Sequence, residues 1–96
     1  MEAYLYILRL QSRGLYIGST TDIEKRYQEH LRGRAARTTR LDPPVSLVHT
    51  ETFDDFSKAR KREAQIKRWS RAKKEALIAG DLDQLKSLSK SRKSIR

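Results

Sequence analysis

Residues 4–19 read YLYILRLQSRGLYIGS and decide how the rest of the chain is organised. Two tyrosine-bearing runs, residues 4–8 and 15–19, are short, apolar and rich in aromatic or β-branched side chains, which is typical of β-strands. The polar segment between them ends in Gly14, and glycine accepts the positive φ that tight turns require. The stretch therefore predicts a β-hairpin.

The first run is predicted to be a central strand. Its even-numbered residues from Tyr4 to Leu10 share one face and Leu5, Ile7 and Arg9 share the other, and both faces are largely apolar. Tyr6 and Tyr16 lie on one face if the turn holds an odd number of residues and on opposite faces if the number is even. The sequence leaves this register open.

Composition indicates one basic domain of 96 residues. Lys and Arg total 22 against 12 Asp and Glu, which gives a net charge of +10 and favours a polyanionic partner. Nucleic acid is the first candidate and an anionic membrane surface the second. The absence of cysteine excludes disulfides, thiolate zinc sites and cysteine nucleophiles.

Two histidines limit the metal chemistry that the chain can offer. Carboxylate and water oxygens would have to hold any ion, which suits Mg²⁺ or Mn²⁺. No apolar run approaches the roughly 18 residues of a membrane span, and the N-terminal residues lack the layout of a signal peptide. We expect a cytoplasmic protein.

A helix is predicted over residues 22–32, after the capping residues 19–22. Ile23, Tyr27 and Leu31 form its apolar stripe, and Arg26 and His30 stand one turn apart along the edge of that stripe. From there both side chains can point into a cleft. The alternative is that Arg26 is a surface arginine and His30 a half-buried spacer.

Residues 32–52 predict an exposed basic loop followed by a third strand. The loop carries four arginines that can contact phosphates, or it is a solvated connection with no such role. These are Arg32, Arg34, Arg37 and Arg40. After Pro43 and Pro44, residues 45–52 alternate as a strand with Val45, Leu47 and His49 on one face.

A second helix is predicted from residue 54 to about residue 69, and Glu63 occupies its buried stripe. Phe56, Ala59 and Ile66 define that inward arc. A carboxylate there is costly unless it is paired or bound to a metal ion. The glutamate is therefore either neutralised by an internal arginine, for which Arg26 is a candidate, or a metal ligand.

Two further helical segments complete the chain. Residues 71–79 form a helix with Ser70 as its cap and Gly80 at its end. A short helix over residues 81–88 precedes a basic, flexible tail over residues 89–96. The chain is thus predicted to be an α+β domain over residues 1–80, with a small, mainly antiparallel three-stranded sheet flanked by helices, and a C-terminal appendage over residues 81–96.

The order of these features resembles the GIY-YIG nuclease superfamily in its small single-domain bacterial branch. The first tyrosine motif appears as residues 4–6 and the second as residues 16–18, about ten residues apart. A helix with an inward arginine follows over residues 20–30, and a glutamate lies on the later segment 59–67. Two departures are Tyr4, where the motif name places glycine, and Ser19, where some members carry a lysine.

The resemblance implies metal-assisted hydrolysis of phosphodiester bonds in DNA, with branched and damaged DNA among the candidate substrates. It implies a catalytic set in which Glu63 holds one divalent ion, Mg²⁺ or Mn²⁺, and either Tyr6 or His30 is the general base. The other implied catalytic members are Tyr16 and Arg26. Gly18 is implied to bind nucleic acid, at a position where a side chain would obstruct a phosphate. The alternative is a basic nucleic-acid-binding protein on the same fold with weak or lost catalysis.

Overall fold

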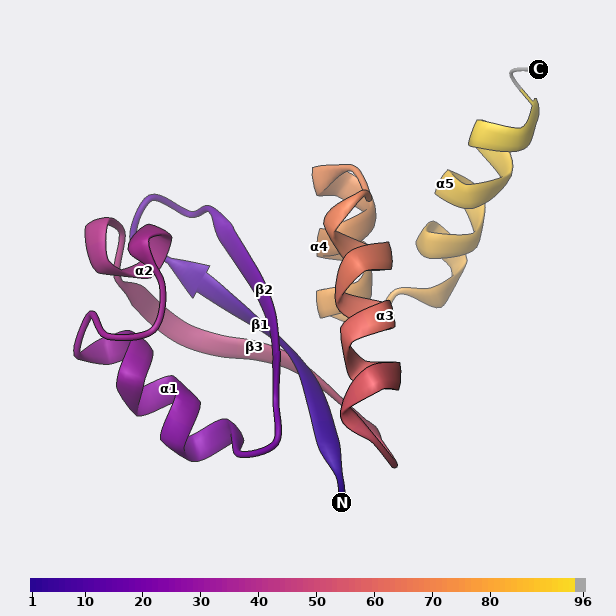
Figure 1. Ribbon diagram of the computed structural model, residues 1–96. Helices are drawn as coiled ribbons and strands as arrows, with labels where there is room; N and C mark the ends of the chain where they lie inside the picture. The colour runs from indigo at the N-terminus through magenta and orange to yellow at the C-terminus, as the bar shows by residue number, and fades with distance from the viewer. Residues whose placement is uncertain (95–96) are drawn as a thin grey trace.

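A three-stranded antiparallel sheet lies between two groups of helices (Figure 1). The computed structural model describes the backbone of residues 1–94 and the side chains of residues 1–88. The elements in chain order are β1 (Ala3–Leu10), β2 (Leu15–Thr20), α1 (Ile23–Leu31), α2 (Arg37–Leu41), β3 (Pro44–Phe53), α3 (Phe56–Lys67), α4 (Arg71–Ala79) and α5 (Leu82–Ser94). The predicted α+β class and the three-stranded sheet are confirmed.

The strand order β2-β1-β3 places β1 in the centre, as its two apolar faces predict. Leu5 and Ile7 pack with Ile66 of α3 on one face, against which residues of α4 also lie. Tyr6 and Leu8 pack on the other face, which α1 covers. Both faces of β1 are therefore buried, whereas β2 and β3 are edge strands.

The hairpin register brings the two motif tyrosines to the same face. Tyr6 pairs with Gly18 and Leu8 pairs with Tyr16, and five residues, 10–14, separate the last pair, Arg9 and Leu15. Because this number is odd, Tyr6 and Tyr16 are diagonal neighbours with ring centroids 6.3 Å apart.

The turn uses a different residue for its left-handed position from the one that the sequence suggests. Arg13 has φ of 75°, and Gly14 does not have a positive φ. Two backbone bonds close the turn, Leu10 N–H to Gly14 O and Arg13 N–H to Leu10 O, each at 2.9 Å. The prediction that Gly14 supplies the positive φ of the turn is wrong, because Arg13, one residue earlier, adopts that conformation.

Two irregularities in β3 overturn the predicted alternation of its side chains. Ile7 pairs with His49 but Leu8 pairs with Leu47, which leaves Val48 as an extra residue between them. His49 and Leu47 consequently lie on opposite faces. His49 bonds Glu51 at 2.9 Å on the α3 side of the sheet, in keeping with a structural role.

The segment predicted as an exposed basic loop contains the short helix α2. Within α2 the Thr39 side chain is completely buried, although the arginines around it are exposed. Periodicity could not indicate this element because one helical turn carries one inward residue, and that residue is polar.

The remaining helices begin and end close to their predicted positions. Asp22, Asp55 and Ser70 cap α1, α3 and α4 with their side chains, and Gly80 ends α4 in the left-handed conformation. Phe56 was expected on the buried arc of α3, but 41% of it is exposed because it is the first residue of the helix and lies at its open end.

The helix after Gly80 is longer than predicted. Its backbone continues to Ser94, and in Figure 1 it extends away from the sheet. The predicted division at residue 80 and the predicted flexibility of residues 89–96 stay predictions, and residues 95–96 lie outside the described part of the chain. Within residues 1–94, no helix is long and apolar enough to cross a membrane.

Candidate active site

Tyr6, Tyr16 and His30 form an aromatic cluster on the α1 side of the sheet. The His30 ring lies edge-on to both tyrosines, with centroids 5.6 Å from Tyr6 and 4.9 Å from Tyr16. His30 is completely buried and Tyr6 is 3% exposed, whereas Tyr16 is half-buried. His30 is therefore neither a surface residue nor a boundary residue but part of the core of the site.

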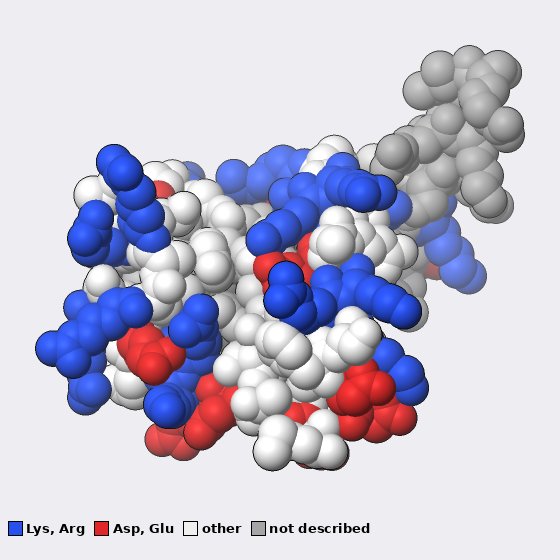
Figure 2. Space-filling view, in the orientation of Figure 1, with Lys and Arg blue, Asp and Glu red and all other residues white. Residues whose placement is uncertain are grey.

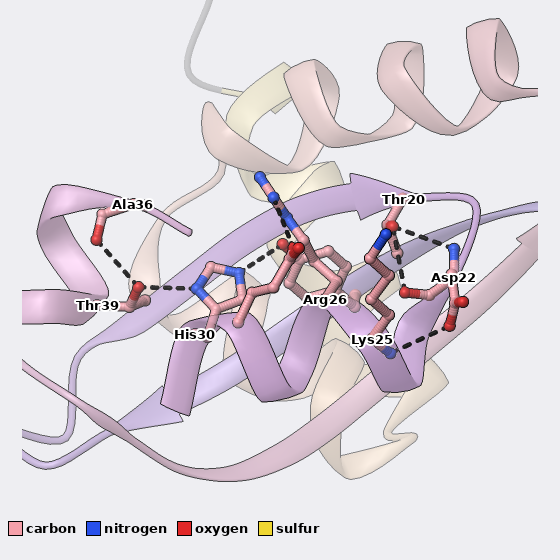
Figure 3. Close-up of polar contacts among 9 residues, drawn as sticks. Thr20, Asp22, Lys25, Arg26, His30, Ala36 and Thr39 are labelled. Atoms are coloured by element: carbon pink, nitrogen blue, oxygen red, sulfur yellow. Dashed lines mark hydrogen bonds and ion pairs between the residues drawn. The ribbon is translucent and has the colours of Figure 1, made fainter. Parts of the chain in front are cut away.

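A chain of hydrogen bonds runs through this cluster to α2. The Tyr6 hydroxyl lies 2.7 Å from Nε2 of His30, and Nδ1 of His30 lies 2.7 Å from Oγ1 of Thr39. The Thr39 hydroxyl also donates to the carbonyl oxygen of Ala36 at 3.2 Å. Figure 3 shows the His30 ring bonded to Thr39 on one side and directed into the site on the other. Thr39 was not predicted to be a site residue because this segment was expected to form a loop.

Burial moves the pKa values of the bonded pair apart. It raises the pKa of Tyr6 to about 12, although the Arg26 guanidinium acts in the opposite direction. Burial also lowers the pKa of His30 to about 4, assisted by the positive charge of Arg26 and opposed by Glu29. Both groups are therefore neutral near pH 7.

Gly18 lies directly beneath the Tyr6 ring. A Cβ atom at this position would lie 2.5 Å from the Tyr6 hydroxyl oxygen and 2.6 Å from Cζ, well inside van der Waals contact. The hydroxyl end of the ring cannot move aside freely because it is buried and bonded to His30. Glycine is therefore required here by Tyr6, a reason different from the expected obstruction of a phosphate.

Arg26 lies at the wall of a hollow of about 550 Å³ beside this cluster. Its side chain is 36% exposed and pairs with Glu29 at 3.1 Å, so its planar donor group is accessible from the hollow. The lining residues come from the end of β2, the connection to α1, α1 itself and the start of α3, and are Ser19, Thr20, Thr21, Asp22, Lys25, Arg26, Glu29 and Phe56. The hollow therefore combines hydroxyl groups with two cations, Lys25 and Arg26, and two carboxylates, Asp22 and Glu29.

Glu63 lies on the opposite face of the sheet from the tyrosine cluster and does not line the hollow that Arg26 lines. Ser19 pairs with Leu5 and Gly18 pairs with Tyr6, so consecutive residues of β2 face α3 and α1 respectively. The Ser19 hydroxyl donates to Oε1 of Glu63 at 2.5 Å, and Ser19 also lines the hollow with Arg26. Because β2 is an edge strand, groups from both faces meet around it.

The Glu63 carboxylate is half-buried and ionised. Its side chain is 19% exposed and pairs with Lys67 at 2.7 Å, not with Arg26 as the structural alternative suggested. Burial alone would raise its pKa, but the hydrogen bonds from Lys67 and Ser19 outweigh burial and hold the pKa below its usual value. Glu63 also helps to raise the pKa of Tyr6, which places its charge within electrostatic reach of the tyrosine cluster.

The four arginines after α1 lie near the cluster along the chain but outside it. All four are exposed, and three of them line a second hollow of about 250 Å³ beside α2. The three that line this hollow are Arg34, Arg37 and Arg40, and the fourth is Arg32. Their charges lie on the surface of the helical turn whose inner side carries Thr39.

The chain matches known proteins over most of its length. The family model described as the GIY-YIG catalytic domain matches residues 2–76. A UPF0213 protein of Natronomonas pharaonis is 50% identical over 83% of this chain and 94% of its own length. A UPF0213 protein of Staphylococcus saprophyticus is 46% identical over 79% of this chain and 93% of its own length.

Two solved structures share the fold. The solution NMR structure of a UPF0213 protein from Bacillus halodurans has a TM-score of 0.55 and 37% identity, and covers 84% of this chain and 86% of that chain. The solution NMR structure of a protein from E. faecalis has a TM-score of 0.57 and 37% identity, and covers 83% and 85%. The fold, the order of the motifs and the family-model match all point to the same family. The chain therefore belongs to the GIY-YIG family of the nuclease superfamily.

Proposed function

We propose that this chain is a metal-dependent endonuclease that hydrolyses phosphodiester bonds in DNA. The observation that carries the proposal is the convergence of groups from three elements around β2. Tyr6, Tyr16 and His30 cluster on one side of this strand, Arg26 lines the hollow at its end, and Glu63 is bonded to Ser19 of the same strand. A protein that only binds nucleic acid has no need of a half-buried glutamate beside buried proton-transfer groups.

Arg26 binds the phosphate in this proposal. Its guanidinium offers a planar pair of donors to two phosphate oxygens, and this contact strengthens as negative charge grows on them. Glu29 holds the side chain from one side through the 3.1 Å ion pair. Lys25, on the rim of the same hollow, adds a second positive charge toward the substrate.

Tyr6 and His30 act together as the base. His30 is completely buried, so it does not reach a water molecule in the hollow, but its Nε2 lies 2.7 Å from the Tyr6 hydroxyl. In this proposal the Tyr6 hydroxyl, which retains 3% exposure, takes the proton of the attacking water, and His30 receives the Tyr6 proton. The half-buried Tyr16 orients the water from the neighbouring strand.

Glu63 and Ser19 would hold the divalent ion. Carboxylate and hydroxyl oxygens are the ligands that Mg²⁺ and Mn²⁺ prefer, and the pKa of Glu63 below its usual value keeps the carboxylate available. Among residues 1–88, no three acidic, histidine or cysteine side chains stand together, so water and substrate would complete the coordination. The ion when bound supplies positive charge that stabilises the phosphate and the leaving oxygen.

A cleavage assay with and without Mg²⁺ or Mn²⁺ tests the proposal. The purified protein is incubated with branched, nicked, single-stranded and duplex DNA, beside Glu63→Gln. We expect cleavage that a chelator abolishes. The variant is expected to cleave about a hundredfold more slowly at limiting metal and to recover partly at high metal, because one charged ligand is lost.

Glu24→Gln is the matched control, since Glu24 is an exposed glutamate on α1 outside the hollow. It is expected to cleave like the unmodified protein. Metal-independent cleavage, or equal rates for Glu63→Gln and the control, would exclude Glu63 as the metal ligand. Binding of DNA without cleavage of any substrate under any condition would contradict the endonuclease and leave the basic nucleic-acid-binding protein as the function.

The exposed arginines beside α2 are proposed to bind the DNA backbone. In Figure 2, Lys and Arg side chains gather over α1 and α2 and again over α3 and α4, with uncharged surface between the two groups. DNA lying across this surface would meet positive charge on both sides of β2. The +10 net charge makes this binding sensitive to salt.

Replacing both Arg37 and Arg40 with glutamine is expected to weaken DNA binding and to flatten its salt dependence. Each lost phosphate contact lowers the slope of log K against log salt by about 0.9 for duplex DNA or about 0.7 for single strands. The dissociation constant is measured by fluorescence anisotropy at several salt concentrations, with Lys86→Gln on α5 as the control. An unchanged slope in the double variant would remove these arginines from the interface.

A further inference from the structure

Thr39 is the one completely buried side chain of the basic segment after α1, and it touches the proposed base directly. We propose that Thr39 is a positioning residue that holds His30 in the tautomer with its proton on Nδ1, which leaves Nε2 free to receive the proton of Tyr6. Its catalytic consequence rests on the proposed function, whereas the tautomer itself does not.

The assignment follows from counting protons along the chain of hydrogen bonds. A carbonyl oxygen only accepts, so the contact between Thr39 and the Ala36 carbonyl uses the single proton of the threonine hydroxyl. Oγ1 of Thr39 must then accept in its 2.7 Å contact with Nδ1 of His30, which makes Nδ1 the protonated nitrogen. Nε2 accepts in turn, and the Tyr6 hydroxyl donates to it at 2.7 Å.

This count requires a neutral imidazole, because a charged one carries protons on both nitrogens. Burial lowers the pKa of His30 to about 4, so the ring is neutral at pH 7 and only one of its two nitrogens carries a proton. The charged and titratable groups that face the ring are Arg26 and Glu29 from α1, Tyr6 from β1 and Tyr16 from β2. Thr39 from α2 is neutral, so it selects the tautomer through hydrogen bonding rather than through charge.

The selected tautomer determines which way a proton can move. With its own hydrogen directed to Nε2, the Tyr6 oxygen has only lone pairs on the side away from His30, where the Arg26 guanidinium also bonds to it. An attacking water transfers one proton to this oxygen while the Tyr6 proton passes to Nε2. The water oxygen forms the new bond to phosphorus, and the bond from phosphorus to the leaving oxygen breaks with its electron pair, which takes a proton from solvent.

The other tautomer blocks this path. If Nε2 carries the proton, it donates to the Tyr6 oxygen and occupies a lone pair, and the Tyr6 hydrogen is left to point away from His30. His30 then has no free nitrogen on the Tyr6 side to receive a proton. A change at Thr39 can therefore disable the base without removing any group that touches the substrate.

The test compares Thr39→Val with Thr39→Ser. Valine keeps the shape of the side chain and removes the acceptor, and serine keeps the hydroxyl. The ¹⁵N resonances of the His30 ring are recorded in the full chain with His49→Gln, so that one histidine remains. Cleavage is measured for the same proteins on a DNA substrate that the unmodified chain cleaves.

We expect Nδ1 to be the protonated nitrogen in the unmodified protein and in Thr39→Ser. In Thr39→Val we expect the proton to move to Nε2 and cleavage to fall by about a hundredfold, with serine restoring the rate to within a few-fold. An unmodified protein with its proton on Nε2, or a valine variant that keeps the original tautomer and rate, overturns the proposal. So does equal loss of cleavage in both variants with the tautomer unchanged.

Failure of the proposed function has a different signature. If the unmodified protein cleaves no DNA, the endonuclease is contradicted, but the ring nitrogen signals still decide whether Thr39 selects the tautomer. The two conclusions therefore stand or fall on separate measurements.

Discussion

Replacing Tyr6 with phenylalanine is expected to lower the rate of DNA cleavage by about a thousandfold to ten-thousandfold. The variant keeps the buried ring and its packing on β1 but removes the only hydroxyl that bonds Nε2 of His30. Loss of a general base typically costs up to four orders of magnitude. Single-turnover cleavage at saturating metal measures the chemical step separately from binding.

Tyr4→Phe is the matched control for this prediction. Tyr4 lies on the same strand and the same face two residues earlier, and its hydroxyl bonds only the exposed Glu2, at 3.2 Å. It is expected to cleave at the unmodified rate. If Tyr6→Phe cleaves as fast as this control, Tyr6 does not transmit the proton and His30 has to act by another route.

The same substitution has a smaller effect on stability. Phenylalanine leaves Nε2 of His30 buried without its hydrogen-bond donor, and an unsatisfied buried acceptor costs about 1–3 kcal/mol. Urea unfolding separates this loss from the kinetic effect. A folded variant that binds DNA normally but does not cleave it is the expected combination.

Much of the site could be predicted because its members lie on regular elements. The alternation of β1 and the helical spacing of Arg26, His30 and Glu63 place each side chain on a face of its own element. These are local rules, and they hold where the backbone is regular. The sequence left open whether Tyr6 and Tyr16 meet, and the five residues of the turn, an odd number, bring them together.

The parts that could not be predicted depend on contacts between distant segments. Thr39 lies in one helical turn, and its buried hydroxyl contacts His30 of another element, so no periodic pattern marks it. His49 and Leu47 separate because Val48 is an extra residue in β3, and the alternation of the sequence does not reveal an irregular strand. The full burial of His30 likewise depends on how α1 and α2 close over the sheet, not on its position in α1.

The sequence left two interpretations of Glu63, a carboxylate neutralised by an internal arginine or a metal ligand, and its contacts bear on this choice. Its inward position was predicted, but its partners are Ser19 across the sheet edge and Lys67 one turn along α3. Arg26 is instead engaged by Glu29. The carboxylate is therefore stabilised by groups that leave Arg26 available to the hollow.

Gly18→Ala is expected to lose both stability and activity because of a single steric contact. The added methyl group would lie 2.5 Å from the Tyr6 hydroxyl oxygen, so the ring must shift away from His30. Overpacking of this kind costs about 1–3 kcal/mol. We expect the free energy of unfolding to fall by that amount and the cleavage rate to fall by about a thousandfold, as for loss of the base itself.

A double-variant cycle with Tyr6→Leu identifies the cause. Leucine removes the ring that the methyl group would meet, so Gly18→Ala in this background is expected to change stability by less than about 0.5 kcal/mol, the scatter between independent sites. Gly14→Ala is the control for glycine replacement, since the atom nearest to its methyl group would be the hydroxyl oxygen of the exposed Ser12, at 3.2 Å. If instead Gly18 is needed to admit a phosphate, its replacement weakens DNA binding and leaves stability unchanged in both backgrounds. The stability of four proteins therefore distinguishes a glycine that seats the proposed base from one that receives the substrate.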